Sequence, residues 1–143
     1  IDEAVMLLKG TAKQKSIYIS KTMPSNIAVY ADKDMLSAVL RNLISNAIKF
    51  VNPHGEINIS AEKKQEMYTI SISDNGIGIP KDRIDKLFQI DENISTPGTQ
   101  NEKGTGLGLI LCNEFIKKNK GNIWAESEEG KGSTFYFTVK ANK

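Results

Sequence analysis

The stretch Asn42-Leu-Ile-Ser-Asn46-Ala-Ile-Lys49-Phe50 decides how this chain folds and what it can bind. At 3.6 residues per turn, Asn42, Asn46 and Lys49 share one narrow face of a helix. A face that is merely solvated favours Glu, Lys and Gln, because Asn is a poor helix former. Two amide oxygens and a cation on one face suit a nucleotide triphosphate with its Mg²⁺. A polar helix face without a ligand is the alternative.

The opposite side of this helix is apolar and broad, which predicts a stripe buried in the core. Its members are Leu36, Val39, Leu40, Leu43, Ile44, Ala47 and Ile48. Asp32 stands where an N-cap is expected, so we predict a helix over residues 32–51.

The composition is that of an ordinary soluble globular protein. The 143 residues suit one domain, with 39% hydrophobic and 25% charged residues. The net charge of +2 gives no reason to expect nucleic acid as a partner. No apolar run approaches the roughly 20 residues that span a bilayer, and no signal peptide is visible. The single cysteine, Cys112, lies in an apolar helical run, which predicts a buried, reduced thiol.

Periodicity predicts the other elements. Alternation of apolar and polar residues predicts strands at residues 16–20, 26–30, 56–62, 67–73, 122–128 and 133–139. Further helices are predicted at residues 2–9, 81–88 and 104–120, the last ended by Gly121. Residues 91–103 are polar and aperiodic, which is typical of a lid or a disordered segment. The fold class is therefore α+β, a two-layer α/β sandwich whose mixed, mostly antiparallel sheet is covered on one face by helices.

Asp74 ends a predicted strand and is followed by Asn75, Gly76 and Gly78. A plain turn is one interpretation, but a helix rather than a matching strand comes next. A carboxylate held at a strand end can accept from an exocyclic amine such as that of adenine. The glycines beside it would let the backbone approach a flat ring.

Residues 104–108, Gly-Thr-Gly-Leu-Gly, open a predicted helix. Free N–H groups and the helix dipole there favour phosphate, although a flexible hinge is also compatible. The Rossmann pattern is excluded because Leu109 stands where glycine is required, and no stretch supplies a P-loop. Residues 130–134 are interpreted as a hairpin turn, from which Thr134 could face a ligand. The only histidine, His54, lies in a Pro/Gly turn and is expected to be solvated.

Taken in order, these segments resemble the ATP-binding catalytic domain of sensor histidine kinases, in the superfamily shared with gyrase and MutL. Residues 42–50 resemble its N box, residues 74–78 its first glycine box, Phe88 its F box, residues 104–108 its second glycine box and residues 132–135 its last. The resemblance runs from about Ser16 onward. It implies that residues 16–143 are the ATP-binding domain and residues 1–15 the end of a preceding dimerisation helix with its linker. Because the chain begins at Ile1, we expect a fragment of a longer protein.

The resemblance implies ATP and Mg²⁺ as cofactors. Asn46 would ligate Mg²⁺, Asn42 would support the metal and the phosphates, and Lys49 would pair with phosphate. Asp74 would bind the adenine amine, and residues 91–103 would form the ATP lid. The other implied nucleotide contacts are Phe50, Gly76, Gly78, Ile79, Phe88, Lys103, Gly104, Thr105, Gly106, Leu107, Gly108 and Thr134.

The resemblance also implies a reaction. Related ATP hydrolases carry Glu at the position of Asn42, and an amide cannot take a proton from water. This favours transfer of the γ-phosphoryl group to a histidine on a separate phosphoacceptor domain, with a response-regulator receiver domain as a further partner. An ATP hydrolase of the same superfamily and a non-catalytic nucleotide-sensing module are the alternatives. We expect a cytoplasmic domain, monomeric when isolated, from a dimeric parent; anchoring of that parent in the inner membrane stays open.

Overall fold

The computed structural model describes residues 10, 12–13, 16–22, 29–79 and 108–141. Its sheet has six strands, in the order β1-β3-β4-β6-β2, and β5 also pairs with β6. The strands are β1 (Tyr18–Thr22), β2 (Val29–Tyr30), β3 (Glu56–Lys64), β4 (Met67–Asp74), β5 (Ile123–Glu128) and β6 (Gly132–Ala141). Only β1 and β3 pair in parallel; the other pairs are antiparallel. The predicted α+β class with a mixed, mostly antiparallel sheet is confirmed.

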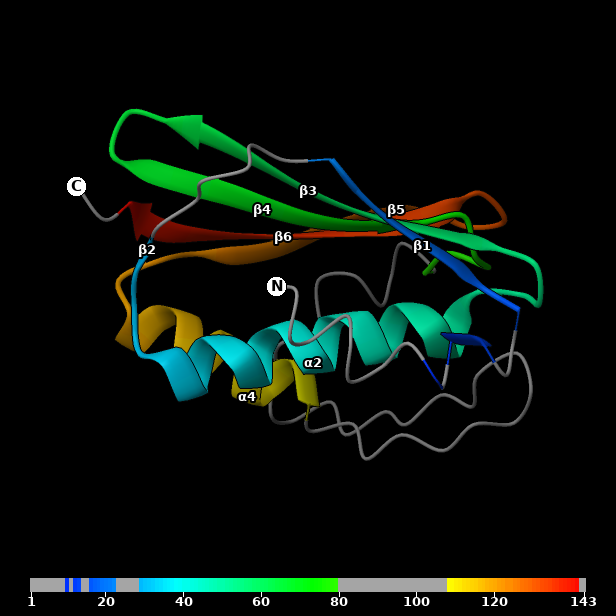
Figure 1. Cartoon of the computed structure of the whole chain (residues 1–143), viewed down its shortest axis with the longest axis horizontal. Helices are drawn as coiled ribbons and strands as arrows, with labels where there is room; N and C mark the ends of the chain where they lie inside the picture. Colours follow the sequence, from blue (N-terminus) through cyan, green and yellow to red (C-terminus); the bar gives the residue numbers. More distant parts are fainter. Residues whose placement is uncertain (1–9, 11, 14–15, 23–28, 80–107, 142–143) are drawn as a thin grey trace.

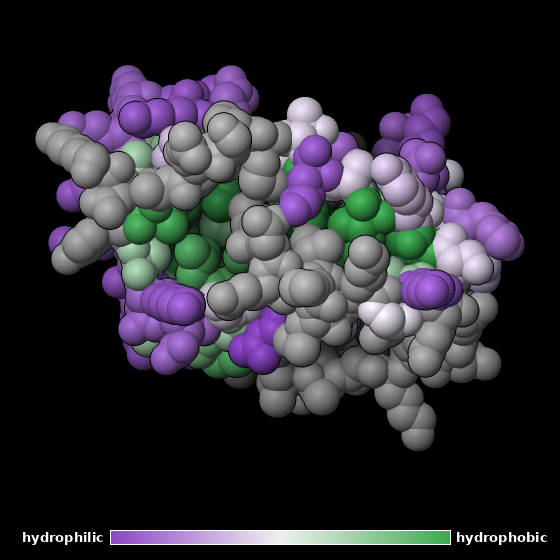
Figure 2. All heavy atoms as spheres, in the orientation of Figure 1, coloured by the Kyte–Doolittle hydropathy of each residue, from purple (hydrophilic) through white to green (hydrophobic). Residues whose placement is uncertain are grey.

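Two helices, α2 (Lys33–Phe50) and α4 (Gly108–Lys118), cover one face of this sheet (Figure 1). They run in opposite directions beside each other, and the far face of the sheet carries neither of them. Apolar side chains fill the band between the two layers, with hydrophilic side chains above and below it (Figure 2).

The apolar stripe of α2 is the centre of the core. Six of its seven predicted members are buried, and Leu36 packs half-buried against them. On β4 the alternation is equally clear, since Tyr68, Ile70 and Ile72 are buried while the residues between them are half-buried. Buried residues recur about every 3.6 positions along the helix and every second position along the strand, so each element has one apolar side. Packing these two sides together removes them from water.

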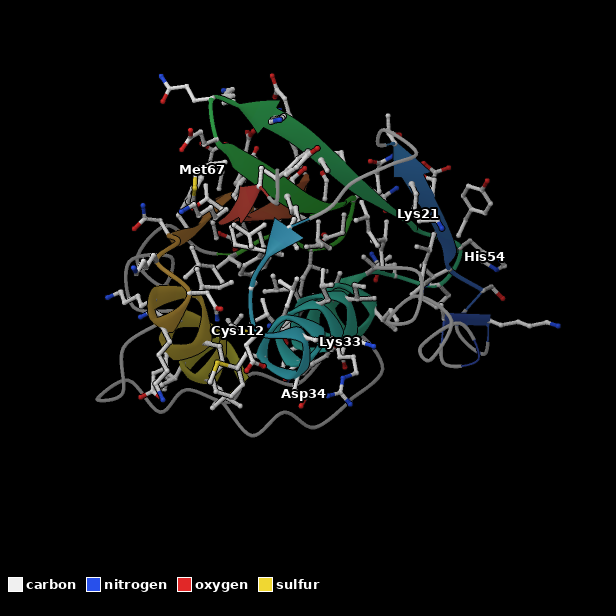
Figure 3. The ribbon with its side chains drawn as sticks, turned by 60° about the vertical axis from the view of Figure 1, so that its left-hand side comes forward. Lys21, Lys33, Asp34, His54, Met67 and Cys112 are labelled. Atoms are coloured by element: carbon white, nitrogen blue, oxygen red, sulfur yellow. The ribbon has the colours of Figure 1, made fainter. Side chains whose placement is uncertain are left out.

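Cys112 of α4 is buried against α2, as predicted (Figure 3). Its Sγ lies 3.8 Å from the carbonyl oxygen of Val39. Burial raises the pKa of this thiol to about 12, which makes it unreactive at neutral pH. Neither described helix has the length and apolar content needed to cross a membrane.

Several predicted boundaries are off by one or two residues: the strand predicted at 56–62 ends at Lys64, and the one predicted at 133–139 spans Gly132–Ala141. Two others are wrong for reasons of backbone geometry. Ser16 has φ 60°, a left-handed conformation that no strand residue adopts, so β1 begins two residues later, at Tyr18. The helix predicted to reach residue 120 ends at Lys118, because Lys120 has φ 64° and the Gly121 N–H donates to Ile116 O at 2.9 Å. The helices predicted at 2–9 and 81–88, the lid at 91–103 and the start of the strand at 26–30 lie outside the described residues.

We predict that Leu43→Ala destabilises the chain by about 3 kcal/mol, because Leu43 is fully buried and its truncation leaves a cavity in the core. Leu111→Ala is the matched control: the same truncation in the other helix, at a side chain that is 40% exposed, should cost less than about 1 kcal/mol. Urea unfolding followed by circular dichroism measures both values. Equal losses would show that the core is centred elsewhere.

Candidate functional site

The polar strip of α2 is the first part of the site. Asp32 caps the helix by accepting from Met35 N at 2.9 Å. The strip residues Asn42, Asn46 and Lys49 are all half-buried. The amide nitrogen of Asn42 donates to Ala38 O, 2.8 Å away, one turn back in the helix. This bond leaves its Oδ1 as the atom of Asn42 that a ligand can use.

The N-terminus of α4 lies at the level of this strip along the helix axis. The two helices are antiparallel, and Cys112 meets α2 at Val39. Four residues earlier in α4 is Gly108, a step of about 6 Å at the helical rise. The same step along α2 leads from Val39 to residue 43, between the two asparagines of the strip. The first N–H groups and the positive dipole end of α4 are therefore placed at the level of Asn42 and Asn46.

Asp74 is the second part of the site. It ends β4 on the inner face of the sheet, in register with Ser133 of β6. Its Oδ1 accepts from Gly76 N at 2.9 Å and from Ser133 N at 3.3 Å. Burial raises the pKa of this carboxyl above its ordinary value, and the two backbone hydrogen bonds oppose that rise. The second oxygen of the carboxyl remains an acceptor for a donor outside this network.

The segment after Asp74 is packed against α2. Ile77 N donates to the carbonyl oxygen of Phe50 at 3.1 Å. A Cβ atom on Gly76 would lie 2.3 Å from that same oxygen, so the position requires glycine. Gly78 has φ 75°, and a Cβ there would lie 2.3 Å from Glu128 O. The glycines therefore let the chain approach its own backbone; their predicted contact with a nucleotide stays a prediction.

Phe50 connects the two parts. It is the last residue of α2, four positions after Asn46 and thus on the same side of the helix. The Nζ of Lys49 lies 4.9 Å from the centre of the Phe50 ring. The polar strip and the Asp74 segment consequently meet at the C-terminal end of α2.

Thr134 is not brought to the site. Its hydroxyl pairs with that of Ser73 at 2.9 Å, while the neighbouring Phe135 is buried toward the helices. Alternation along β6 therefore places Thr134 on the outer face and Ser133 on the inner face, beside Asp74. The sequence reasoning missed Ser133, although counting outward from Phe135 by twos would have found it.

The structure describes two of the remaining predicted site residues. Ile79 is described and packs half-buried against the core, and Gly108 begins α4. Outside the described residues lie Phe88, Lys103, Gly104, Thr105, Gly106 and Leu107. His54 is exposed in the turn after α2, as predicted (Figure 3).

The described residues contain no group of three His, Cys, Asp or Glu side chains that could hold a metal ion. The side-chain amide oxygens on α2 are therefore the candidate metal ligands. Such a set suits Mg²⁺, which takes few protein ligands and completes its shell with phosphate oxygens and water.

The sequence and fold of this chain are similar to those of several known proteins. Residues 31–143 match the family described as histidine kinase-, DNA gyrase B-, and HSP90-like ATPase. Sensor histidine kinase WalK of Bacillus subtilis (strain 168) is 36% identical over 130 residues, which are 89% of this chain and 21% of WalK. Adaptive-response sensory kinase SasA of Synechococcus elongatus is 43% identical over 112 residues, 78% of this chain and 28% of SasA.

Among solved structures, the catalytic domain of histidine kinase ThkA superposes with a TM-score of 0.83 at 30% identity, over 97% of this chain and 88% of that one. The chain thus spans nearly all of a solved catalytic domain, but under a third of the length of WalK and of this SasA.

We predict that Asp74→Asn gains stability relative to the parent as the pH rises from 4 to 7. The folded-state pKa of Asp74 is raised by burial, so ionisation costs stability, and this cost develops as the pH rises through that pKa. Asparagine carries no charge at either pH. Urea unfolding of both proteins at the two pH values tests this, with Glu62→Gln as a control for the loss of one exposed carboxylate. A difference between parent and Asp74→Asn that does not change with pH would contradict the prediction.

Proposed function

Because the chain belongs to the histidine kinase-, DNA gyrase B-, and HSP90-like ATPase family, we propose that it binds Mg-ATP and transfers the γ-phosphoryl group to a histidine on a separate phosphoacceptor domain. One observation carries this proposal. The amide strip of α2 and the Asp74 carboxylate meet at Phe50, so a single ligand with an amine at one end and phosphates at the other can reach both.

Asp74 recognises the adenine end. Its Oδ1 is held by two backbone N–H groups, which orient the carboxyl so that the other oxygen faces the ligand. A partly buried acceptor forms a stronger hydrogen bond than one in bulk water. The 6-amine of adenine is the donor that matches it, whereas guanine carries at that ring position a carbonyl oxygen, which cannot donate.

Asn42, Asn46 and Lys49 serve the phosphate end. The side-chain amide oxygen of Asn46 would ligate Mg²⁺, Oδ1 of Asn42 would support the metal and the phosphates, and Lys49 would neutralise phosphate charge. Bound Mg²⁺ supplies charge neutralisation at the phosphates and fixes their orientation. The N-terminus of α4 adds N–H donors and a positive dipole end at the same level.

The chemistry follows from what the strip lacks. Its two amides cannot act as a base, and the described residues place no carboxylate on it. Phosphoryl transfer depends mainly on positioning and charge neutralisation, so the strip suffices to present the γ-phosphate to an external histidine.

Two partners complete the proposal: a phosphoacceptor histidine domain and a response-regulator receiver domain. ThkA, whose catalytic domain shares this fold at 30% identity, has been solved in complex with response regulator protein TrrA, which supports the second partner.

We predict that Asn46→Ala reduces phosphoryl transfer at least a hundredfold while ATP binding in the absence of Mg²⁺ changes less than threefold, because the amide acts on the metal. Transfer is measured with radiolabelled ATP and a histidine phosphoacceptor domain supplied as a separate polypeptide. Asn58→Ala is the control, since this half-buried amide lies on β3 and bonds only to Ser20 and Thr22 among the described residues. Transfer by Asn46→Ala at the parent rate would refute the assignment.

Hydrolysis provides a separate test. Without a carboxylate base on the strip, we expect the chain alone to release inorganic phosphate from ATP at a rate far below its rate of transfer to the acceptor domain. A phosphate-release assay measures this. Fast release that survives Asn42→Ala would indicate an ATP hydrolase instead, and ATP binding without any transfer would indicate a nucleotide-sensing module.

A further inference from the structure

The hairpin between β5 and β6 holds the segment that follows Asp74. Gly130 N donates to Ile77 O at 2.7 Å. Gly78 passes so close to Glu128 O that no Cβ fits between them. Ile79 N donates to the Oγ of Ser127 at 2.7 Å. The last of these contacts is the only one of the three that depends on a side chain.

Ser127 occupies a position where an apolar residue is expected. Along β5 the exposed residues alternate with half-buried ones, and Ser127 follows Ile123 and Ala125 on the inner side. Ser133, its partner in the β5–β6 register, is likewise an inward serine, followed by the buried Phe135. Polar residues at inward positions break the alternation of the strands, and such breaks are expected where function requires them.

The Ser127 hydroxyl has a partner for each of its three hydrogen-bonding sites. It donates to Gly132 O at 2.9 Å, and it accepts from Ile79 N. The Oγ of Ser133 lies 2.8 Å away, close enough to donate to the remaining lone pair. Ser133 in turn donates its backbone N–H to Asp74. One hydroxyl therefore joins the segment after Asp74 to the strand that orients the Asp74 carboxyl.

We infer that Ser127 is a positioning residue that sets the selectivity of the site for adenine over guanine. This inference rests on the proposed function. Ser127 holds both sides of the place where the base meets Asp74: the backbone at Ile79 and the β6 backbone at Ser133. Without the hydroxyl, Ile79 N–H loses its acceptor and the segment is free to shift relative to the carboxylate. Selectivity suffers most, because the carboxylate accepts from the 6-amine of adenine, whereas guanine carries a carbonyl oxygen at that ring position.

The test is calorimetric titration of the whole chain with Mg-ATP and with Mg-GTP. For Ser127→Ala we expect ATP binding to weaken about tenfold, the factor typical of one lost hydrogen bond, while GTP binding changes less than twofold. Ser127→Thr keeps the hydroxyl and should restore the parent ratio of the two dissociation constants. Ser60→Ala is the matched control, since it also removes a half-buried serine hydroxyl that pairs with a serine, Ser71, across the sheet.

Thermal unfolding of each variant separates positioning from plain stability. A lowered melting temperature with an unchanged ratio of ATP to GTP affinity overturns the inference and leaves the proposed function intact. A parent chain that does not bind ATP overturns both. If Ser127→Ala does not fold, Ser127→Cys takes its place. The thiol is a weak acceptor for Ile79 N–H, so the preference for ATP over GTP must also decrease in Ser127→Cys. An unchanged ratio of the two affinities in this variant refutes the inference.

Discussion

The site depends on the hydrogen bond that the carbonyl oxygen of Phe50 accepts from Ile77 N. Phe50 is the last residue of α2, so no N–H of its own helix bonds to this oxygen. Ile77 N–H bonds to it, and this approach is possible only because Gly76 has no side chain. One orphan carbonyl at a helix end thus ties the helix that carries Asn46 to the strand end that carries Asp74. A bulkier residue at position 76 would separate the two parts of the site.

The buried position of the Asp74 carboxyl costs the fold some stability. Asp74, Ser127 and Ser133 take inward positions at the end of a sheet whose inner face otherwise buries Ile72 and Phe135. Burial disfavours the charged form of the carboxyl and raises its pKa. Hydrogen bonds from backbone groups and hydroxyls offset part of this cost. Stability given up at a site that must recognise a ligand is a common compromise in proteins.

The C-terminal end of α4 is joined to the N-terminal end of α2. Asn119, just after α4, accepts from Asp32 N at 2.9 Å and donates to Phe115 O at 2.8 Å. It therefore joins the end of one helix to the N-cap of the other. Gly121 then lets the chain pass close to Thr138 O of β6. Because α4 is rigid, this clamp at its end also sets where its N-terminus lies relative to the asparagines of α2.

The sequence by itself determined α2 and β4 almost to the residue, because a period of 3.6 or 2 and an N-cap are local properties. It also placed both asparagines on one helix face. Only the tertiary structure decided which residue of β6 meets Asp74. That choice depends on the β4–β6 register, which joins Asp74 to a serine 59 positions away. The tertiary structure likewise decided that Gly76 and Gly78 make room for the protein's own backbone. No local sequence pattern encodes which distant carbonyl a glycine will approach.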